Sequence, residues 1–138
     1  MKRKEPKYKY NYVMLLDDRD LDNFINTKMI EANYFAEKIY VNSSGKSALE
    51  FLLNLCKLGE QGTVVYPEVI FIDVNMPLID GFQFIEYFKK IENKKLQQCK
   101  LVVLTSSIYA EDKEKTQKLS KDIIFLNKPL TDIALSTL

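Results

Sequence analysis

The sequence predicts an α/β domain in which a five-stranded parallel sheet is covered by helices on both faces. Three observations lead to this fold class. Short apolar runs alternate with segments of helical period along the whole chain. The run Val69–Val74 is apolar except for one acid, which is typical of a central parallel strand buried on both faces. The length of 138 residues leaves room for one such domain.

The first half of the chain predicts two strand–helix units. Tyr12–Leu16 is rich in strand formers and ends at two adjacent acids. Asp20 is expected to cap the first helix. The apolar positions of that helix recur at Leu21, Phe24, Ile25, Met29 and Ala32. Lys38–Val41 predicts the second strand, and Lys46–Leu58 predicts a second helix that Gly59 closes.

The second half predicts three further units. A surface loop is expected at Glu60–Pro67, followed by the strand Val69–Val74 and a helix that begins at Gly81. The remaining elements are a strand at Leu101–Leu104, a helix at Ala110–Leu119, a strand at Ile123–Leu126 and a short helix within Leu130–Leu138. This alternation predicts a doubly wound, flavodoxin-like sheet with strand order 2-1-3-4-5. Ligands of such sheets bind beyond the carboxyl ends of the strands, here near the first and third strands.

The composition excludes several kinds of chemistry. The chain has no histidine, so it carries no Ser-His-Asp or Cys-His pair, no HExxH metal site and no phosphohistidine of its own. A net charge of +1 argues against bulk attraction to nucleic acid or anionic lipid. Cys56 and Cys99 lack CxxC spacing and are expected to be reduced, partly buried thiols. No run predicts a membrane span or a secretion signal, so we expect a cytoplasmic protein.

The amino terminus is the exception to the balanced charge. Residues 1–9 are expected to form a basic tail that precedes a single domain at residues 10–138. The basic residues of the tail are Lys2, Arg3, Lys4, Lys7 and Lys9. A solvated, frayed terminus is the favoured interpretation, and an arm that touches nucleic acid is the less favoured one.

Polar side chains follow four of the five predicted strands. They are Asp17 and Asp18, Asp73, Thr105 and Ser106, and Lys128. Because the carboxyl ends of parallel strands meet at one edge of the sheet, the acids should gather there and repel one another unless a cation neutralises them. Hard oxygen ligands with access to water suit Mg²⁺ (or Mn²⁺), and Lys128 would supply a second positive charge.

Each of these residues has an ordinary interpretation when it is taken alone. Asp18 would be a helix cap or turn former, Thr105 a strand-end hydroxyl and Lys128 a solvated lysine. Asp73 is harder to explain in this way, because four apolar residues precede it and a buried carboxylate without a partner is costly. Together the residues predict a functional acidic site.

Four segments carry a resemblance to a known family. They are LLDDRDLDNF around Asp17 and Asp18, FIDVNMPLIDG around Asp73, VVLTSS around Thr105 and FLNKPL around Lys128. Their order and spacing resemble the receiver domain of two-component response regulators, from about Tyr12 to the carboxyl terminus. FIDVNMPLIDG is the most specific of the four segments.

The resemblance implies how the acids act. Asp73 would be the phospho-acceptor, which attacks a phosphoryl group and forms an acyl phosphate. Asp17 and Asp18 would hold Mg²⁺, with Asp18 as a direct ligand and Asp17 acting mainly through water. Asp73 and the backbone carbonyl of Asn75 would complete the metal ligands of the protein. Pro129 matches the proline that follows a cis peptide bond in this family.

The resemblance also implies how the phosphoryl group is held and sensed. Thr105 would hydrogen-bond it, the backbone N–H of Ser106 would donate to it and Lys128 would pair with its oxygens. Phe125 occupies the position of an aromatic switch residue that rotates inward, although ordinary core packing explains it equally well. The switching face would combine the fourth helix, the fifth strand and the last helix.

The implied partners follow from the missing histidine. The phosphoryl donor would be a phosphohistidine on a sensor kinase or a histidine phosphotransfer protein, and acetyl phosphate can substitute. We expect a bacterial, stand-alone receiver that docks to a downstream protein or passes phosphate onward, with no nucleic-acid or membrane partner. It would be a switch and no enzyme, apart from self-phosphorylation and slow autodephosphorylation.

Two alternative functions remain at this stage. A degenerate receiver would act as an interaction module that needs no phosphorylation. A phosphatase of the haloacid-dehalogenase type would also use an aspartate nucleophile and Mg²⁺, but its DxD pattern belongs on the first strand. Arg19 after the acid pair, Ser106 after Thr105, the long segment at residues 60–66 and the short last helix depart from the receiver pattern.

Overall fold

The chain folds around one five-stranded sheet, which the computed structural model describes for residues 6–106 and 110–138. Its strands are β1 (Tyr10–Leu16), β2 (Ala36–Asn42), β3 (Val69–Ile72), β4 (Lys100–Thr105) and β5 (Ile124–Asn127). All neighbouring strands are parallel and their order is 2-1-3-4-5, which confirms the predicted topology. Lys2, Arg3 and Lys4 of the expected basic tail lie outside the described residues.

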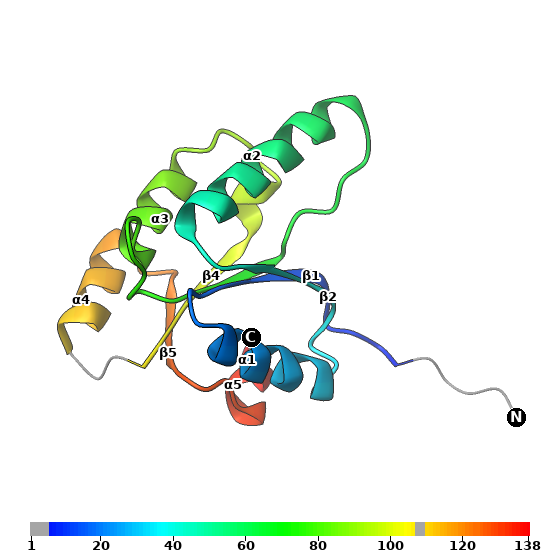
Figure 1. The fold of residues 1–138 in the computed structure, drawn as a ribbon. Coiled ribbons are helices and arrows are strands. Elements are labelled where there is room, and N and C mark those ends of the chain that lie inside the picture. Colours follow the sequence, from blue (N-terminus) through cyan, green and yellow to red (C-terminus); the bar gives the residue numbers. More distant parts are fainter. Residues whose placement is uncertain (1–5, 107–109) are drawn as a thin grey trace, which may run out of the picture.

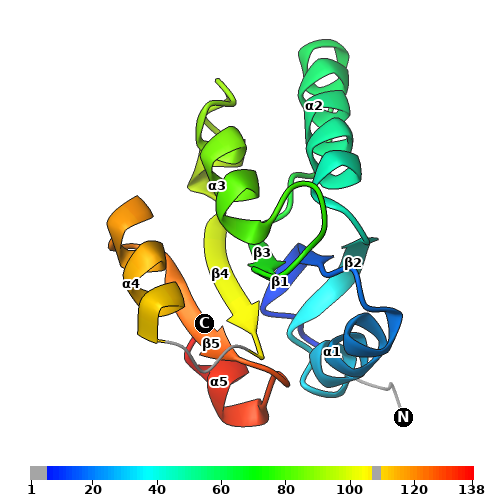
Figure 2. The ribbon, with the colours of Figure 1, turned by 60° about the vertical axis from the view of Figure 1, so that its left-hand side comes forward.

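Helices cover both faces of this sheet. They are α1 (Asp20–Ala32), α2 (Gly45–Gln61), α3 (Gly81–Lys89), α4 (Ala110–Leu119) and α5 (Asp132–Ser136), with a short 3-10 turn at Leu96–Gln98. Figure 1 shows α1 and α5 on one face and α2, α3 and α4 on the other. Figure 2 shows α1 beside β2, and α4 and α5 beside β5. Within the described part of the chain, no helix is long and apolar enough to cross a membrane.

Alternate side chains of each central strand enter two separate apolar cores. In β1, Met14 and Leu16 pack toward α2 and α3, whereas Val13 and Leu15 pack toward α1 and α5. β3 is buried at all four positions, as predicted for a strand covered on both faces. Because both faces of the central strands pack on apolar cores, their polar side chains lie at or beyond the strand ends.

The second helix is longer than predicted. It continues through Gly59 to Gln61, so Gly59 does not end it and the following loop is shorter than expected. A Cβ atom at Gly59 would collide with the hydroxyl of Tyr66, so the glycine makes room for a tertiary contact. β3 begins at Val69 as predicted, whereas the other four strands begin one or two residues away from their predicted positions, and Tyr10 already pairs with Ala36.

The inner face of α1 differs from the predicted one. Leu21 and Phe24 are 69% and 60% exposed, and Ile25 is also exposed. Asn23, Asn26 and Ile30 are the buried residues of the helix. Asp20 is the first helical residue and not the cap, because Arg19 occupies the N-cap position. The prediction was wrong because this helix packs partly on the polar strand ends, where amide side chains find hydrogen-bond partners.

Candidate functional site

The sheet itself brings the predicted polar residues together. Asp73 follows β3, and its backbone N–H donates to the carbonyl of Leu16 at 2.9 Å, which places it beside Asp17. The backbone N–H of Lys128 likewise donates to the carbonyl of Thr105 at 2.9 Å. Parallel hydrogen bonding therefore continues beyond the strands and aligns the residues that follow β1, β3 and β5 at one edge.

Three carboxylates form the acidic part of the site. Asp17, Asp18 and Asp73 each offer one oxygen, and these oxygens all lie within 4.8 Å of one another. Asp17 and Asp73 are each only 4% exposed, whereas Asp18 is exposed. Hard oxygen ligands, two of them fixed by burial and one open to water, fit Mg²⁺, which keeps several of its own waters. These residues could hold such a cation.

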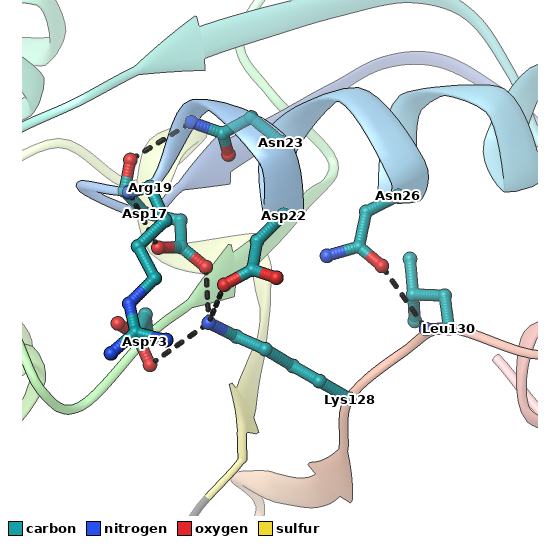
Figure 3. Close-up of polar contacts among 8 residues, drawn as sticks. All are labelled: Asp17, Arg19, Asp22, Asn23, Asn26, Asp73, Lys128 and Leu130. Carbon is teal, nitrogen blue, oxygen red and sulfur yellow. Dashed lines mark hydrogen bonds and ion pairs between the residues drawn. The ribbon is translucent and has the colours of Figure 1, made fainter.

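Lys128 reaches into this cluster from the segment that follows β5. Its ammonium contacts Asp17 and lies 3.0 Å from Asp22 Oδ2 and 3.4 Å from Asp73 Oδ1 (Figure 3). The side chain of Lys128 is only 8% exposed, so these ion pairs are largely shielded from water. One buried ammonium thus bridges carboxylates from three elements.

Asp22 was missed by the sequence reasoning. It lies in the first turn of α1, where its spacing matched the polar side of an ordinary helix. Its partner Lys128 is 106 positions away in the chain. A usable signal did exist, because the first turn of a helix that follows a parallel strand lies at the carboxyl edge of the sheet.

Two asparagines of α1 were also missed. Asn23 Nδ2 donates to the backbone carbonyl of Asp17 at 2.8 Å, and the backbone N–H of Leu130 donates to Asn26 Oδ1 at 3.1 Å. The backbone N–H of Arg19 donates to Asp17 Oδ1 at 3.0 Å. These bonds tie α1 to the segments on both sides of the acidic cluster.

Burial and neighbouring charges together raise the pKa of two groups in the site, Asp73 and Lys128. Desolvation, together with the charge of Asp17, raises the pKa of Asp73 from 3.8 to about 6, although Lys128 partly offsets this. Burial alone would lower the pKa of Lys128. Its hydrogen bonds with Asp17 and Asp22 outweigh that effect and raise the pKa above the ordinary value. At pH 7 to 8 Asp73 is therefore largely ionised, but its buried charge destabilises the fold. A second positive charge nearby would reduce this destabilisation.

The remaining predicted residues lie around this cluster. Thr105 is fully buried at the end of β4 and pairs in register with Asn127, next to Lys128. Ser106 and Asn75 are exposed at the same edge. Phe125 is half-buried against the core on the α2 and α3 side. The peptide bond between Lys128 and Pro129 is cis, as the resemblance implied.

Both cysteines lie away from these residues as free, half-buried thiols. Burial raises the pKa of Cys99 to about 12 and also raises the pKa of Cys56. Neither thiol is therefore activated as a nucleophile.

The costly ionisation of Asp73 predicts a pH-dependent stability. With divalent cations removed and above pH 7, Asp73→Asn should be more stable than the unchanged chain, with a free energy of unfolding higher by about 2 kcal/mol. The unfolded chain ionises Asp73 near pH 3.8 and the folded chain only near 6, so this penalty is absent below pH 3.8 and complete above about 6. Urea unfolding in EDTA across this range measures it. A difference that stays constant with pH would show that the buried charge of Asp73 is not its cause.

Comparison with known proteins gives the family. No family model matches the chain. A two-component response regulator from Cytophaga hutchinsonii is 33% identical, with 92% of each chain covered and a TM-score of 0.80. The receiver domain of the Arabidopsis thaliana histidine kinase CKI1, in complex with Mg²⁺ and BeF₃⁻, is 22% identical with a TM-score of 0.75, over 93% of this chain and 91% of that one. The second likeness supports the fold alone.

A curated relative is more distant. The probable methanogenesis regulatory protein FilR2 of Methanothrix harundinacea (strain 6Ac) is 27% identical over 100 residues, which is 72% of this chain. The match spans 61% of the length of that protein. The likeness to the Cytophaga regulator, by contrast, extends over nearly the whole of both chains. The chain belongs to the two-component response regulators and has the fold of their receiver domains.

Proposed function

We propose that this receiver accepts a phosphoryl group on Asp73 from a phosphohistidine of a partner protein. The observation that carries the proposal is the setting of Asp73: a carboxylate 4% exposed, grouped with Asp17 and Asp18 and paired with Lys128. Phosphoryl transfer needs little from a protein beyond positioning and charge neutralisation. This arrangement supplies a nucleophile, a cation site and an ammonium at one edge.

The transfer conserves atoms and charge in a simple way. One oxygen of Asp73 bonds to phosphorus while the bond between phosphorus and the histidine nitrogen of the donor breaks. The imidazole leaves with that electron pair and takes a proton from solvent. Lys128 neutralises the transferred oxygens, and Thr105 and the backbone N–H of Ser106 donate hydrogen bonds to them.

The cation would be held by the chain's own oxygens. Asp17, Asp18, Asp73 and the backbone carbonyl of Asn75 would bind Mg²⁺ or Mn²⁺, which neutralises charge on the phosphoryl oxygens when bound. Its charge would also lower the pKa of Asp73 and keep the nucleophile ionised.

The donor histidine would lie outside this sequence, which contains no histidine. We place the domain at residues 10–138 after a basic tail at residues 1–9, in the cytoplasm, where a sensor kinase or a phosphotransfer protein would reach it. The new charge of about −1.5 to −2 would draw in Thr105 and allow Phe125 to turn inward, which changes the face of α4, β5 and α5 for a downstream protein.

One experiment tests the proposal. The purified chain is incubated with acetyl phosphate, once with Mg²⁺ and once with EDTA, and its intact mass is followed over time. A single phosphoryl adduct that needs Mg²⁺ and decays slowly is the expected result. An unmodified protein would favour the phosphorylation-independent module, and rapid turnover of many phosphate esters would favour the phosphatase.

The exposed apolar residues of α1 indicate where the donor docks. Leu21, Phe24 and Ile25 share one side of the helix, at positions i, i+3 and i+4, and the first turn of the same helix contacts Lys128. A protein that delivers phosphate to Asp73 must cover the surface beside it. Exposed apolar side chains at that place fit such a contact.

Replacing Phe24 should therefore separate two donors. Phe24→Ser is expected to slow phosphoryl transfer from a phosphorylated histidine phosphotransfer domain by about 10-fold, because aromatic residues dominate protein contacts. Phosphorylation by acetyl phosphate should not change. Leu53→Ser is the matched control, since Leu53 is an exposed apolar residue (48%) of α2 on the other face of the sheet. Equal rates for both variants with the protein donor would place the docking surface elsewhere.

A further inference from the structure

Asp22 is an acid of the site that the strand ends do not supply. Its Oδ2 lies 3.0 Å from the Lys128 ammonium, as close as an ordinary hydrogen bond. It projects from the first turn of α1, and its side chain is 25% exposed, against 6% and 4% for Asp17 and Asp73. It does not belong to the three carboxylates whose oxygens group within 4.8 Å.

This position separates Asp22 from the other partners of Lys128. Asp17 and Asp73 are shared between the lysine and the cation site, so a cation there competes with Lys128 for their oxygens. Asp22 lies outside that group, and among the described residues its ion pair is with Lys128. When the other two carboxylates are engaged, Asp22 is the carboxylate that remains paired with the ammonium.

The support of Asp22 is fixed in place. Asn23 Nδ2 donates to the carbonyl of Asp17, and Asn26 accepts from the backbone N–H of Leu130, so the helical turn after Asp22 is tied to the segments that follow β1 and β5 (Figure 3). Asp22 therefore cannot follow Lys128 far when the ammonium moves. A lysine that moves toward a group on Asp73 must lengthen its contact with Asp22.

The geometry points to Asp22 as a positioning residue that holds Lys128 in the resting state and competes with the phosphoryl oxygens on Asp73 for its ammonium. This inference rests on the proposed function, because it concerns the same lysine and the same acceptor. Asp22 also places a negative charge beside the incoming anion. Both effects disfavour the state in which Asp73 carries a phosphoryl group. Asp22, in the first turn of α1, therefore lowers the affinity of the site for that group.

Beryllofluoride, a phosphoryl analogue, measures this competition. At saturating Mg²⁺, the full chain carrying Asp22→Asn should reach half-saturation at about 3 to 10 times less beryllofluoride than the unchanged chain. The Asp22→Glu variant, which restores the charge, should return toward the original value. Asp20→Asn is the matched control, since Asp20 is exposed, lies on the same turn and forms no ion pair in the described part of the chain.

A readout without metal separates pairing from a general charge effect. In EDTA, urea unfolding of Asp22→Asn, Lys128→Gln and the double variant gives the coupling between the two residues. Asp22→Asn should lower the free energy of unfolding more when Lys128 is present than when Lys128 is replaced by Gln.

The outcomes distinguish this inference from the function on which it rests. Half-saturation of Asp22→Asn equal to that of Asp20→Asn, weaker binding, or zero coupling in EDTA would overturn the role of Asp22 alone. A wild-type chain that binds no beryllofluoride in Mg²⁺ and forms no adduct with acetyl phosphate would overturn both.

Discussion

The Asp73→Asn variant is expected to form no phosphoryl adduct under conditions in which the unchanged chain is modified. The amide cannot attack phosphorus, and the neighbouring acids are poorly placed to replace it. Asp17 is buried and already bonded to Arg19 and Lys128, and Asp18 lies on the exposed side of the cluster. We expect the adduct to fall by more than about 100-fold, as is usual when a covalent nucleophile is removed.

Intact mass after incubation with acetyl phosphate and Mg²⁺ measures this loss. Asp20→Asn serves as the control for a loss of one negative charge on the same edge. An adduct that survives in Asp73→Asn and maps to another carboxylate would show that Asp73 is not the acceptor. Retained folding of the variant is expected, because the amide has nearly the shape of the carboxylate and removes a costly buried charge.

Gly81→Ala is expected to cost about 3 kcal/mol of folding free energy and to displace Asp73, the proposed acceptor. The first residue of α3 lies directly against the segment that follows β3, where its backbone N–H donates to the carbonyl of Val74 at 3.1 Å. A Cβ atom there would lie 2.8 Å from Val74 Cα and would overlap the backbone carbonyl oxygen of Asp73. Neither neighbour is a flexible side chain, so the backbone that carries Asp73 would have to shift.

Urea unfolding, together with the rate of phosphorylation by acetyl phosphate, tests this effect. Gly62→Ala is the matched control, since a Cβ at Gly62 would meet only the carbonyl oxygen of Leu58 at 4.0 Å. We expect Gly62→Ala to be nearly neutral and Gly81→Ala to lose both stability and phosphorylation rate. Equal stability of the two variants would show that α3 can retreat from the acceptor without cost.

The sheet and the positions of its polar ends could be predicted from the sequence because two independent patterns agree. Apolar runs mark the strands, and parallel strands must place the residues that follow them at one edge. Asp17, Asp73 and Lys128 therefore meet as expected, with no need to know any side-chain contact. The strand order was predicted as the usual one of a five-stranded, flavodoxin-like sheet, and the structure has it.

The inner face of α1 could not be predicted in the same way. Helical periodicity assigns apolar residues to the core, yet Phe24 is 60% exposed and Asn26 is 2% exposed. A buried amide is stable only where a specific partner accepts or donates, and the partner of Asn26 is the backbone of Leu130 from the far end of the chain. Asp22 was missed for the same reason. Such partners are brought close by the tertiary fold, and the helical periodicity of the sequence carries no information about them.

Gly59 illustrates a second limit. Glycine near the end of a helical pattern commonly ends the helix, but in this chain the helix continues and the glycine accommodates the hydroxyl of Tyr66. The local preference was real, and a side chain from a later loop overrode it.

The two sides of α1 have a joint consequence. One side exposes Phe24, where we propose that the donor docks, and the other side carries Asp22, which pairs with Lys128. Where a docked protein binds the paired and the open state with different affinities, its binding and the breakage of the ion pair are linked, and the coupling free energy is the same in either direction. A donor that binds more tightly once the pair is open will open it by the same factor, and would thereby prime the acceptor that it serves.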